Sequence, residues 1–509
     1  MKQEKSQLKI GIILNYVNMI LGNLIPIFYT PVMLRLLGQS EYGLYKLSGS
    51  VTSYLGLISL GIGSAMTRYL IKAREEEGRD AEERILGLFM VIFQIIALAA
   101  LAVGTVLTLN LQVFYGHSLT APELSRMKIL VFLMVCNTAL SFSQSPYGAV
   151  VTAHEKFIFQ QCMNIVTTCV GPLLNVVMLM LGYASIGMTV SSLIVGIMCR
   201  VAFTLYTRKS MGIRPKYRNM PTSMLREILA FSFWVFVSNV VGQLYNATDT
   251  VMMGAVPGLA TTGVAVYSIG ATLSGIIGSI ATGVSALLSP SVNRLVFQGP
   301  SDEELLAYAI KFGRIQSYFA GLLVSGFVVF GKPFIWFYAG AGYEAAYWVA
   351  VCMSVPSIIY LSQSICVTIT VAKNKHQFRS VVYVIIACVN IVGTWFAMRR
   401  FGVIGASFIT GVAVVLGHGI LMNWFYHVKM NLNMVYFWKQ IGRVYRVPAV
   451  LCAGFLGLGK WIDFYEPHLL LVGIVFYTIL FCILCWKFAM NKYEKQLIQE
   501  AICGIIKNA

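Results

Sequence analysis

The feature that most constrains this chain is a series of apolar segments, each about 20 residues long or longer, that recurs along its whole length. A helix of about that length crosses the roughly 30 Å hydrocarbon core of a bilayer. These segments are too long for the alternating strands of about 10 residues found in outer-membrane barrels. Only 11% of the residues are charged, against about 25% in soluble domains. The sequence therefore predicts an all-α, polytopic membrane protein.

Fourteen candidate transmembrane helices can be placed. They cover residues 10–37, 43–71, 86–111, 127–152, 158–181, 183–206, 228–256, 261–289, 308–333, 345–372, 379–399, 401–427, 444–462 and 467–489. The first is too long for a signal-peptide core, so we expect a retained span. Basic stretches follow the sixth and the twelfth. We therefore predict an N-lobe of spans 1–6 (residues 1–207), a cytoplasmic basic linker (208–227), a C-lobe of spans 7–12 (228–428), and a final pair of spans with a tail (429–509).

The two predicted lobes share a short-motif repeat. At a shift of 220 residues the segment 38–43, GQSEYG, aligns with 258–263, GLATTG, and Asn23 aligns with Gln243. An even number of spans in each repeat gives both halves the same orientation, so they should be related by an axis along the membrane normal. The sequence thus predicts two pseudo-symmetric six-helix lobes that can rock around a central site.

The distribution of basic residues predicts the orientation. If the N-terminus is cytoplasmic, the segments on that side hold 28 of the 38 Lys and Arg residues, as the positive-inside rule requires. We therefore expect both termini in the cytoplasm. The net charge of +18 is spread over short segments with no basic domain interleaved with aromatic residues, so we expect no nucleic-acid partner.

Motifs for catalysis and for ATP-driven transport are missing from the sequence. It contains neither GxxxxGK[ST] nor GxSxG, the signatures of a P-loop and of a hydrolase nucleophile. Extramembrane stretches of about 20 residues at most are too short for an ATPase domain. No Cys/His cluster suggests zinc. We expect no catalytic residue and no metal site, with a membrane-embedded enzyme of unfamiliar type as a minor alternative.

One carboxylate lies deep inside an apolar segment. Nineteen of the 20 acidic residues fall in loops, tails or the first turn of a span, whereas Asp249 lies well within residues 228–256. Its burial costs at least about 2.5 kcal/mol on insertion scales, so it should face protein or a wet cavity. Asn239, Gln243 and Asn246 precede it on the same helical face. We predict a polar stripe that leads to a carboxylate with a role in substrate or ion handling.

Structural roles are the alternatives for these polar residues. Asp249 could form an ion pair with Arg35 or Lys46, and the amides could hold helices together by hydrogen bonds. The first span has a neutral stripe of the same kind, with Asn23 beside it.

Short motifs in both predicted lobes resemble one known family. Residues 35–45, RLLGQSEYGLY, and 60–68, LGIGSAMTR, resemble the opening of polysaccharide-biosynthesis flippases. These are the O-antigen and oligosaccharide-lipid exporters of the multidrug/oligosaccharidyl-lipid/polysaccharide superfamily. Residues 249–254, DTVMMG, and 263–267, GVAVY, are similar to a second pattern of that family. The resemblance extends over the chain in the number of spans and the 6 + 6 + 2 arrangement.

The resemblance implies a V-shaped pair of lobes that opens alternately to each side, with spans 13 and 14 providing a groove for a lipid tail. The expected cargo is a lipid-linked oligosaccharide of the undecaprenyl-pyrophosphate type, moved from the cytoplasmic to the outer leaflet. Arg35 is the first candidate for the pyrophosphate contact, and Lys46 and Arg68 are the next. Asn23, Asn239, Gln243 and Asn246 would bind sugar hydroxyls. Asp249 would couple transport to H⁺ or Na⁺, without any other cofactor.

Further expectations follow from the same resemblance. The protein would lie in the bacterial cytoplasmic (inner) membrane, in contact with membrane lipids and with candidate partners such as a glycan polymerase and glycosyltransferases. Two other functions stay open: a multidrug/cation antiporter of the same superfamily, and a non-transporting scaffold for glycan assembly.

Overall fold

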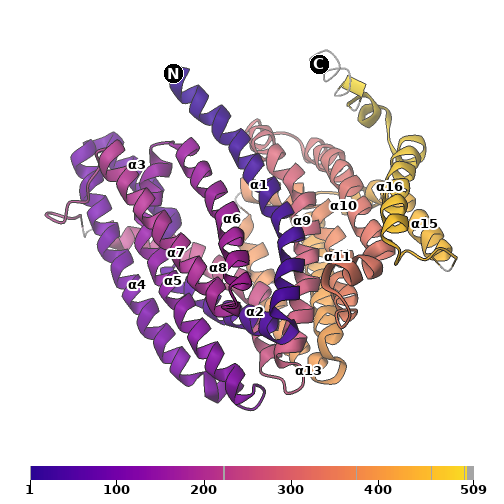
Figure 1. Ribbon diagram of the computed structural model, residues 1–509. Helices are drawn as coiled ribbons and strands as arrows, with labels where there is room; N and C mark the ends of the chain where they lie inside the picture. Colours follow the sequence, from indigo (N-terminus) through magenta and orange to yellow (C-terminus); the bar gives the residue numbers. More distant parts are fainter. Residues whose placement is uncertain (1, 222–223, 374, 460, 498, 501–509) are drawn as a thin grey trace. The chain divides into compact units, whose positions relative to one another are not determined.

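The computed structural model describes residues 2–221, 224–373, 375–459, 461–497 and 499–500, and over these residues it contains helices and no strand (Figure 1). By its internal contacts the chain divides into two compact units, Met1–Ala265 and Val266–Ala509. The all-helical architecture predicted from the sequence is confirmed.

The described residues of the first unit form eight α-helices, two short helical turns and the beginning of a ninth helix. They are α1 (Lys2–Leu37), α2 (Gln39–Ser53), η1 (Tyr54–Ser59), α3 (Ile62–Glu77), α4 (Arg79–Tyr115), α5 (Ala121–Ala153), α6 (Phe157–Met180), α7 (Ala184–Leu205), η2 (Tyr206–Ser210), α8 (Leu225–Gly254) and the start of α9 (Ala260–Phe297). Helix α4 packs along α5, α1 packs along α6, and α7 packs against α5 and α6.

The second unit continues from within α9. Its further elements are α10 (Asp302–Ala339), α11 (Ala345–Ser362), α12 (Ser364–Ala372), α13 (His376–Val414), η4 (Val415–Leu421), α14 (Met422–Lys429), α15 (Met434–Leu458), α16 (Pro467–Leu484) and η5 (Cys485–Ala489). Helix α10 packs against α11 and α15, and α11 packs against α13. Phe437 and Tyr426 are fully buried in its core.

Twelve helices in the described part of the chain are long and apolar enough to cross a membrane, so the expected count of fourteen is not confirmed. Two local features account for the difference. The predicted span 43–71 is divided among α2, η1 and α3, because Leu60 and Gly61 adopt left-handed backbone conformations. The predicted spans 379–399 and 401–427 lie in the single stretch Phe378–Lys429, in which Gly402 has a non-helical backbone (φ 61°, ψ −147°) between two helices. The chain turns back there, because an added Cβ at Gly393 would lie 2.9 Å from the Ile409 side chain. The protein is a multi-pass membrane protein.

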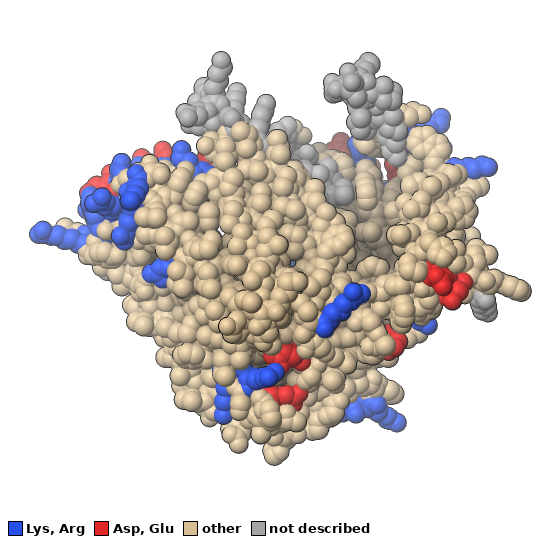
Figure 2. Space-filling model, viewed as in Figure 1, with Lys and Arg blue, Asp and Glu red and all other residues tan. Residues whose placement is uncertain are grey.

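The surfaces of these helices are suited to lipid. Large apolar side chains such as Leu109, Val113 and Phe396 are more than two-thirds exposed, and most of the face seen in Figure 2 carries no charged side chain. In contrast, residues such as Leu70, Leu86 and Phe89 are fully buried between α3 and α4. Because lipid is as apolar as a protein core, packing between helices rather than polarity separates buried from exposed residues here.

The internal repeat has a counterpart in the backbone. Glycines with positive φ end or break helices at three pairs of positions, and each pair is separated by 220 or 221 residues. The pairs are Gly38 and Gly258 (φ 76° and 83°), Gly78 and Gly299 (82° and 68°), and Gly182 and Gly402 (84° and 61°). Glycine populates this region at no steric cost. The two halves of the sequence therefore repeat their turn geometry as well as their motifs.

Helix α8 belongs by its contacts to the first unit, where it packs against α2, α3 and η1. In the sequence it is the first helix of the predicted C-lobe. The contact boundary, at residues 265 and 266, thus lies one helix later than the predicted linker at 208–227. The lobes themselves stay a prediction about which helices move together.

The chain after η2 is anchored to the first turns of α4, where basic and acidic side chains gather near α3 and α4 in Figure 2. The Lys216 backbone N–H donates to the Glu83 carbonyl oxygen at 2.9 Å. The Lys216 ammonium donates to Asp80 and lies 3.0 Å from a Glu83 carboxylate oxygen. These bonds to Asp80 and then to Glu83 raise the pKa of Lys216. The start of the predicted basic linker is therefore docked rather than free.

Replacing Gly87 by alanine should loosen this anchor. An added Cβ at position 87 would lie 2.0 Å from the Lys216 carbonyl oxygen, so the backbone must move, at a cost of about 1–3 kcal/mol. We expect faster tryptic cleavage between residues 214 and 218 in the detergent-purified protein. Gly148→Ala is the control, because its Cβ would meet nothing within 4 Å. Equal cleavage rates in the two variants would contradict the docking.

Candidate functional site

The two aligned glycine motifs of the repeat meet in the first unit. An added Cβ at Gly43 in α2 would lie 1.7 Å from the carbonyl oxygen of Thr261 at the start of α9. One at Gly254, at the end of α8, would lie 2.5 Å from a methyl carbon of Leu47. The absence of a side chain lets the two backbones approach at Gly43 and makes room for the Leu47 side chain at Gly254. We call this contact between residues 38–54 and 248–261 the seam.

Hydrogen bonds join the two sides of the seam at one end. The Ser40 hydroxyl lies 3.1 Å from the Thr261 hydroxyl and donates to a Glu123 carboxylate oxygen at 2.7 Å. Thr261 also donates to this oxygen, at 3.2 Å. The other Glu123 oxygen accepts from the backbone and side chain of Thr120 in a capping box that starts α5. One carboxylate thus connects α2, α5 and α9.

The turn between α4 and α5 completes this end of the seam. The Ser118 hydroxyl donates to the Gly254 carbonyl oxygen at 2.7 Å, and the Tyr115 hydroxyl donates to the Val251 carbonyl oxygen at 3.3 Å. The last carbonyls of a helix have no partner within the helix. Side chains of the α4–α5 turn therefore satisfy the C-terminal end of α8.

Asp249 lies within the seam and is 2% exposed. Its neighbours Thr248 and Thr250 are also buried. The Thr248 hydroxyl lies 2.6 Å from the Tyr54 hydroxyl, so η1 contacts α8 beside the carboxylate. The carboxylate is enclosed by protein rather than turned towards acyl chains, as the cost of burying it in lipid requires.

The stripe on α8 changes in exposure along its length. Asn239 is exposed, and Gln243 is partly buried and donates to the Ser53 hydroxyl of α2. The side chain of Asn246 lies outside the described residues. The stripe therefore runs from an exposed amide, through an amide bonded across the seam, to the buried carboxylate.

The predicted cations have different environments. Lys46 is partly buried, with its ammonium 5.4 Å from the centre of the Tyr42 ring. Arg68 is exposed, and its guanidinium lies 5.3 Å from the centre of the Phe231 ring of α8. Arg35 is exposed in the last turn of α1. Lys46 and Arg68 thus belong to elements that pack against α8.

Asn23, on α1, donates to the Met19 carbonyl oxygen within its own helix at 2.8 Å. Its role in sugar binding stays a prediction.

Several seam residues were not predicted from the sequence. Gly43, Thr261 and Ser40 lie in the aligned motifs, so the repeat was a signal for them, but it gave no indication that the two motifs touch. Tyr54 and Thr248 had no signal apart from the proximity of Thr248 to Asp249. A hydroxyl pair between distant segments has no sequence signature, because either member is an ordinary residue in a membrane helix.

The chemistry available at the seam is hydrogen bonding with one buried carboxylate. In the described part of the chain no group of three or more His, Cys, Asp or Glu side chains could hold a metal ion. Serine, threonine and tyrosine hydroxyls bonded to neutral partners are suited to contacts that can separate, because the net value of each is only about 1 kcal/mol.

The fold is shared with solved transporters of low sequence identity. The lipid II flippase MurJ in an inward closed conformation superposes with a TM-score of 0.74 at 15% identity, covering 94% of this chain and 99% of that chain. An inward-facing multidrug resistance MATE family transporter of the MOP superfamily superposes with a TM-score of 0.56 at 10% identity. The match covers 81% of this chain and 99% of that chain. The Vibrio cholerae MATE transporter VcmN, in its bent form, superposes with a TM-score of 0.52 at 13% identity. The match covers 85% of this chain and 99% of that chain.

The sequence itself matches a protein family. A search of the curated proteins gave no match. Residues 8–290 match the family described as polysaccharide biosynthesis protein, which is more than half of the 509-residue chain. The family and the fold neighbours are transporters and flippases rather than enzymes. The chain therefore belongs to the polysaccharide biosynthesis protein family and has the fold of the flippases and exporters of the MOP superfamily.

Proposed function

We propose that this protein is a flippase that moves a lipid-linked oligosaccharide of the undecaprenyl-pyrophosphate type from the cytoplasmic to the outer leaflet, for cell-surface polysaccharide biosynthesis. The observation that carries the proposal is the family match over residues 8–290. The likeness in fold to a lipid II flippase over 94% of the chain supports it. No bond changes in this reaction, so the protein needs a path for the polar head and no catalytic residue.

In this proposal the seam is the closed outer gate. The positive-inside distribution predicts that the turns at residues 38–42, 112–126 and 257–260 face outward. The seam joins these three turns through Gly43, Ser40, Glu123 and Thr261. Separation of α2 from α8 and α9 would open the outer side, and its closure would leave access from the cytoplasm, as alternating access requires.

The polar residues then divide into cargo-binding and coupling roles. Arg35, Lys46 and Arg68 would contact the pyrophosphate, for which charged donors are suited. Asn23, Asn239, Gln243 and Asn246 would replace the hydration of sugar hydroxyls. Asp249 would couple opening of the gate to H⁺ or Na⁺. Its side chain is now 2% exposed, and this exposure must change if α8 leaves α2. This assignment is supported by the position of Asp249 inside the seam.

The proposal places the protein in the bacterial cytoplasmic membrane with both termini inside. The location of 28 of the 38 basic residues on the predicted cytoplasmic side supports the orientation. A glycan polymerase and glycosyltransferases would act on the product and supply the substrate.

A multidrug/cation antiporter is the second candidate function. The fold neighbours that are MATE multidrug transporters favour it, as does the buried Asp249, because a carboxylate is suited to binding an organic cation. The two candidates differ in the phenotype of a deletion. Loss of surface polysaccharide supports the flippase, and sensitivity to cationic drugs with intact polysaccharide supports the antiporter.

Locking the seam should stop transport. In the double variant Ser40→Cys/Thr261→Cys the two thiols replace hydroxyls that lie 3.1 Å apart, close enough for a disulfide after small adjustments. We expect oxidation to abolish export of the surface glycan and a reductant to restore it. Each single cysteine variant is the control. Full export by a protein shown to be cross-linked would contradict the gate.

Filling the seam should have the opposite structural effect. Gly43→Ala places a Cβ against the Thr261 carbonyl, so the outer side can no longer close fully. We expect export to fall at least tenfold while the protein level in the membrane stays near normal. Gly49→Ala, in the same helix, would meet nothing within 4 Å and should keep normal export. Similar loss in both variants would show that α2 tolerates no substitution and that the contact is not special.

Neutralising the buried carboxylate tests its coupling role. Asp249→Asn keeps the shape of the side chain, so we expect normal insertion into the membrane and loss of most glycan export. Asp463→Asn, at an exposed position, is the control and should leave glycan export unchanged. The measurement is surface glycan per unit of protein detected in the membrane. Normal export by Asp249→Asn at normal expression would remove this residue from the mechanism.

A further inference from the structure

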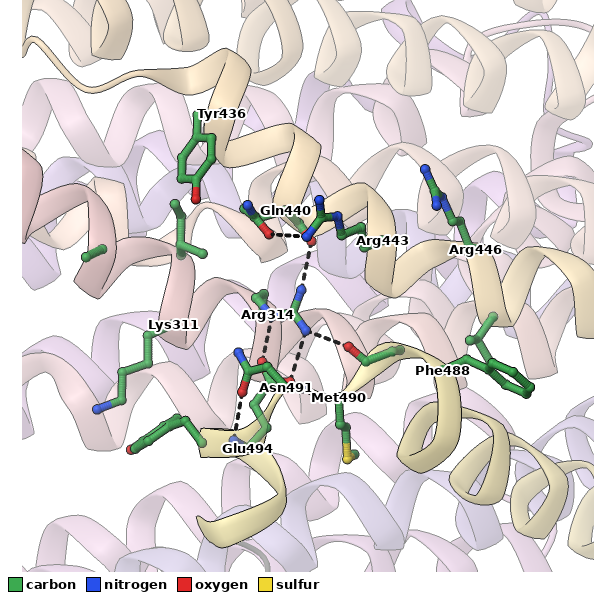
Figure 3. A pocket seen from close by; sticks show the side chains of 15 residues that line it. Lys311, Arg314, Tyr436, Gln440, Arg443, Arg446, Phe488, Met490, Asn491 and Glu494 are labelled. Atoms are coloured by element: carbon green, nitrogen blue, oxygen red, sulfur yellow. Dashed lines mark hydrogen bonds and ion pairs between the residues drawn. The ribbon is translucent and has the colours of Figure 1, made fainter.

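A cavity of about 740 Å³ in the second unit is lined by α10, α15 and the segment 488–494 that follows α16 (Figure 3). Its volume lies within the range of about 300–1,000 Å³ that is usual for small-ligand sites. None of its lining residues was included in the predicted site. The basic ones were counted only as part of the cytoplasmic charge.

The floor of this cavity is a buried ion pair. The Arg314 guanidinium donates to the two carboxylate oxygens of Glu494 at 2.6 and 3.0 Å, and both residues are about 5% exposed or less. Arg314 also donates to the carbonyl oxygens of Gln440 and Ala489, at 3.0 and 2.7 Å. Figure 3 shows this arginine between α15 and the segment after η5. The pair thus fixes three separate parts of the chain around the cavity.

Three further cations line the same cavity. They are Lys311 on α10 and Arg443 and Arg446 on α15. None of the three forms an ion pair with a residue in the described part of the chain. Glu494 is the one acidic residue in the lining, and it is neutralised by Arg314. The cavity therefore carries three positive charges that no lining carboxylate balances.

The positions of these cations are partly fixed. The Lys311 ammonium lies 4.0 Å from the centre of the Tyr493 ring, within the range of a cation–π contact. Arg443 donates to the Gln440 side-chain oxygen at 3.3 Å. Tyr436, Gln440 and Arg443 follow one another at helical spacing along one side of α15 in Figure 3. The donors are therefore arranged before any ligand enters.

The surroundings of the cavity are apolar and suited to lipid. Phe488, which lines it, is 69% exposed. Along α16 the side chains of Val475, Phe476 and Ile483 are each more than half exposed. A second hollow, which Ile483 and Trp486 line together with Lys487 and Lys495, lies on the same C-terminal elements. A ligand at this place would have a phosphate or other anion next to long hydrocarbon chains.

We infer that this cavity binds the phosphate-bearing headgroup of an anionic membrane lipid, held by Lys311, Arg443 and Arg446, with its acyl or prenyl chains along the exposed face of α16. Arginine is suited to this ligand because its planar fork matches phosphate geometry in a bidentate manner. Basic pockets between membrane helices on the cytoplasmic side bind such headgroups in other proteins. The inference does not depend on the proposed flippase function.

The test uses the full-length protein purified in a zwitterionic detergent. Equilibrium binding is measured by native mass spectrometry with phosphatidylglycerol, phosphatidylcholine, undecaprenyl diphosphate and inorganic pyrophosphate as separate probes. The test variant is Arg443→Gln/Arg446→Gln. The matched control is Arg399→Gln/Arg400→Gln, which removes two exposed charges from α13, outside the cavity lining. Thermal unfolding of each variant establishes that it is folded.

We expect phosphatidylglycerol to bind at least tenfold more tightly than phosphatidylcholine. The affinity of the test variant for phosphatidylglycerol should fall at least tenfold, while that of the control variant should stay unchanged. Tighter binding of undecaprenyl diphosphate, with the same loss in the test variant, would identify a prenyl diphosphate as the preferred lipid. Equal binding of the two phospholipids, or an equal loss in the control, would overturn the inference. Inorganic pyrophosphate that binds as tightly as the lipids would overturn the assignment of a lipid. Export assays address the flippase separately, because these outcomes concern binding alone.

Discussion

Hydrocarbon offers no hydrogen-bond partners to a polypeptide, and the rest of this structure follows from that constraint. Backbone groups must be satisfied within each segment, so a membrane chain of this kind forms helices. Polar side chains must find partners within the protein, and these partners differ in strength. The seam combines close glycine packing with hydroxyl contacts. Each is worth about 1 kcal/mol net between neutral groups, and about 1.5–3 kcal/mol where Ser40 or Thr261 donates to Glu123. Removing one partner of a buried ion pair such as Arg314 and Glu494 costs about 3–5 kcal/mol. The seam is therefore suited to opening and closing, whereas the C-terminal segment is suited to staying in place.

The sequence predicted the architecture well because the bilayer leaves little choice. Long apolar segments specify helices, and the cost of a buried carboxylate predicted that Asp249 would face protein or a wet cavity rather than lipid. Its 2% exposure places it against protein. The number of spans was harder to predict where the backbone conformation of single residues decides it. Leu60 and Gly61 divide one predicted span, and Gly402 turns the chain between the helices of two others, which lie in one helical stretch. Such effects depend on single φ angles that hydropathy does not register.

The candidate site was harder to predict than the fold because it depends on contacts between distant segments. Gly43 was visible as part of a repeat, but its contact with Thr261 is a property of packing. Arg314 and Glu494 are 180 residues apart. In the sequence each was an ordinary charged residue near the end of a span. Charge bias predicts on which side of the membrane such residues lie, and it contains no information about which of them meet.

The repeat also bears on the proposed coupling. Its glycines Gly38 and Gly258 both have positive φ, but the two halves do not share the carboxylate. At the shift of 220 residues, Asp249 corresponds to Tyr29. Two identical halves would respond identically to a proton or a sodium ion. Because the carboxylate occurs in one half, on a helix of the seam, the proposed mechanism would let a single ionisation or ion-binding event act on the gate from one side. In the proposed mechanism the repeated turns would provide the hinges, and the unshared carboxylate would be the place where an ion gradient biases them.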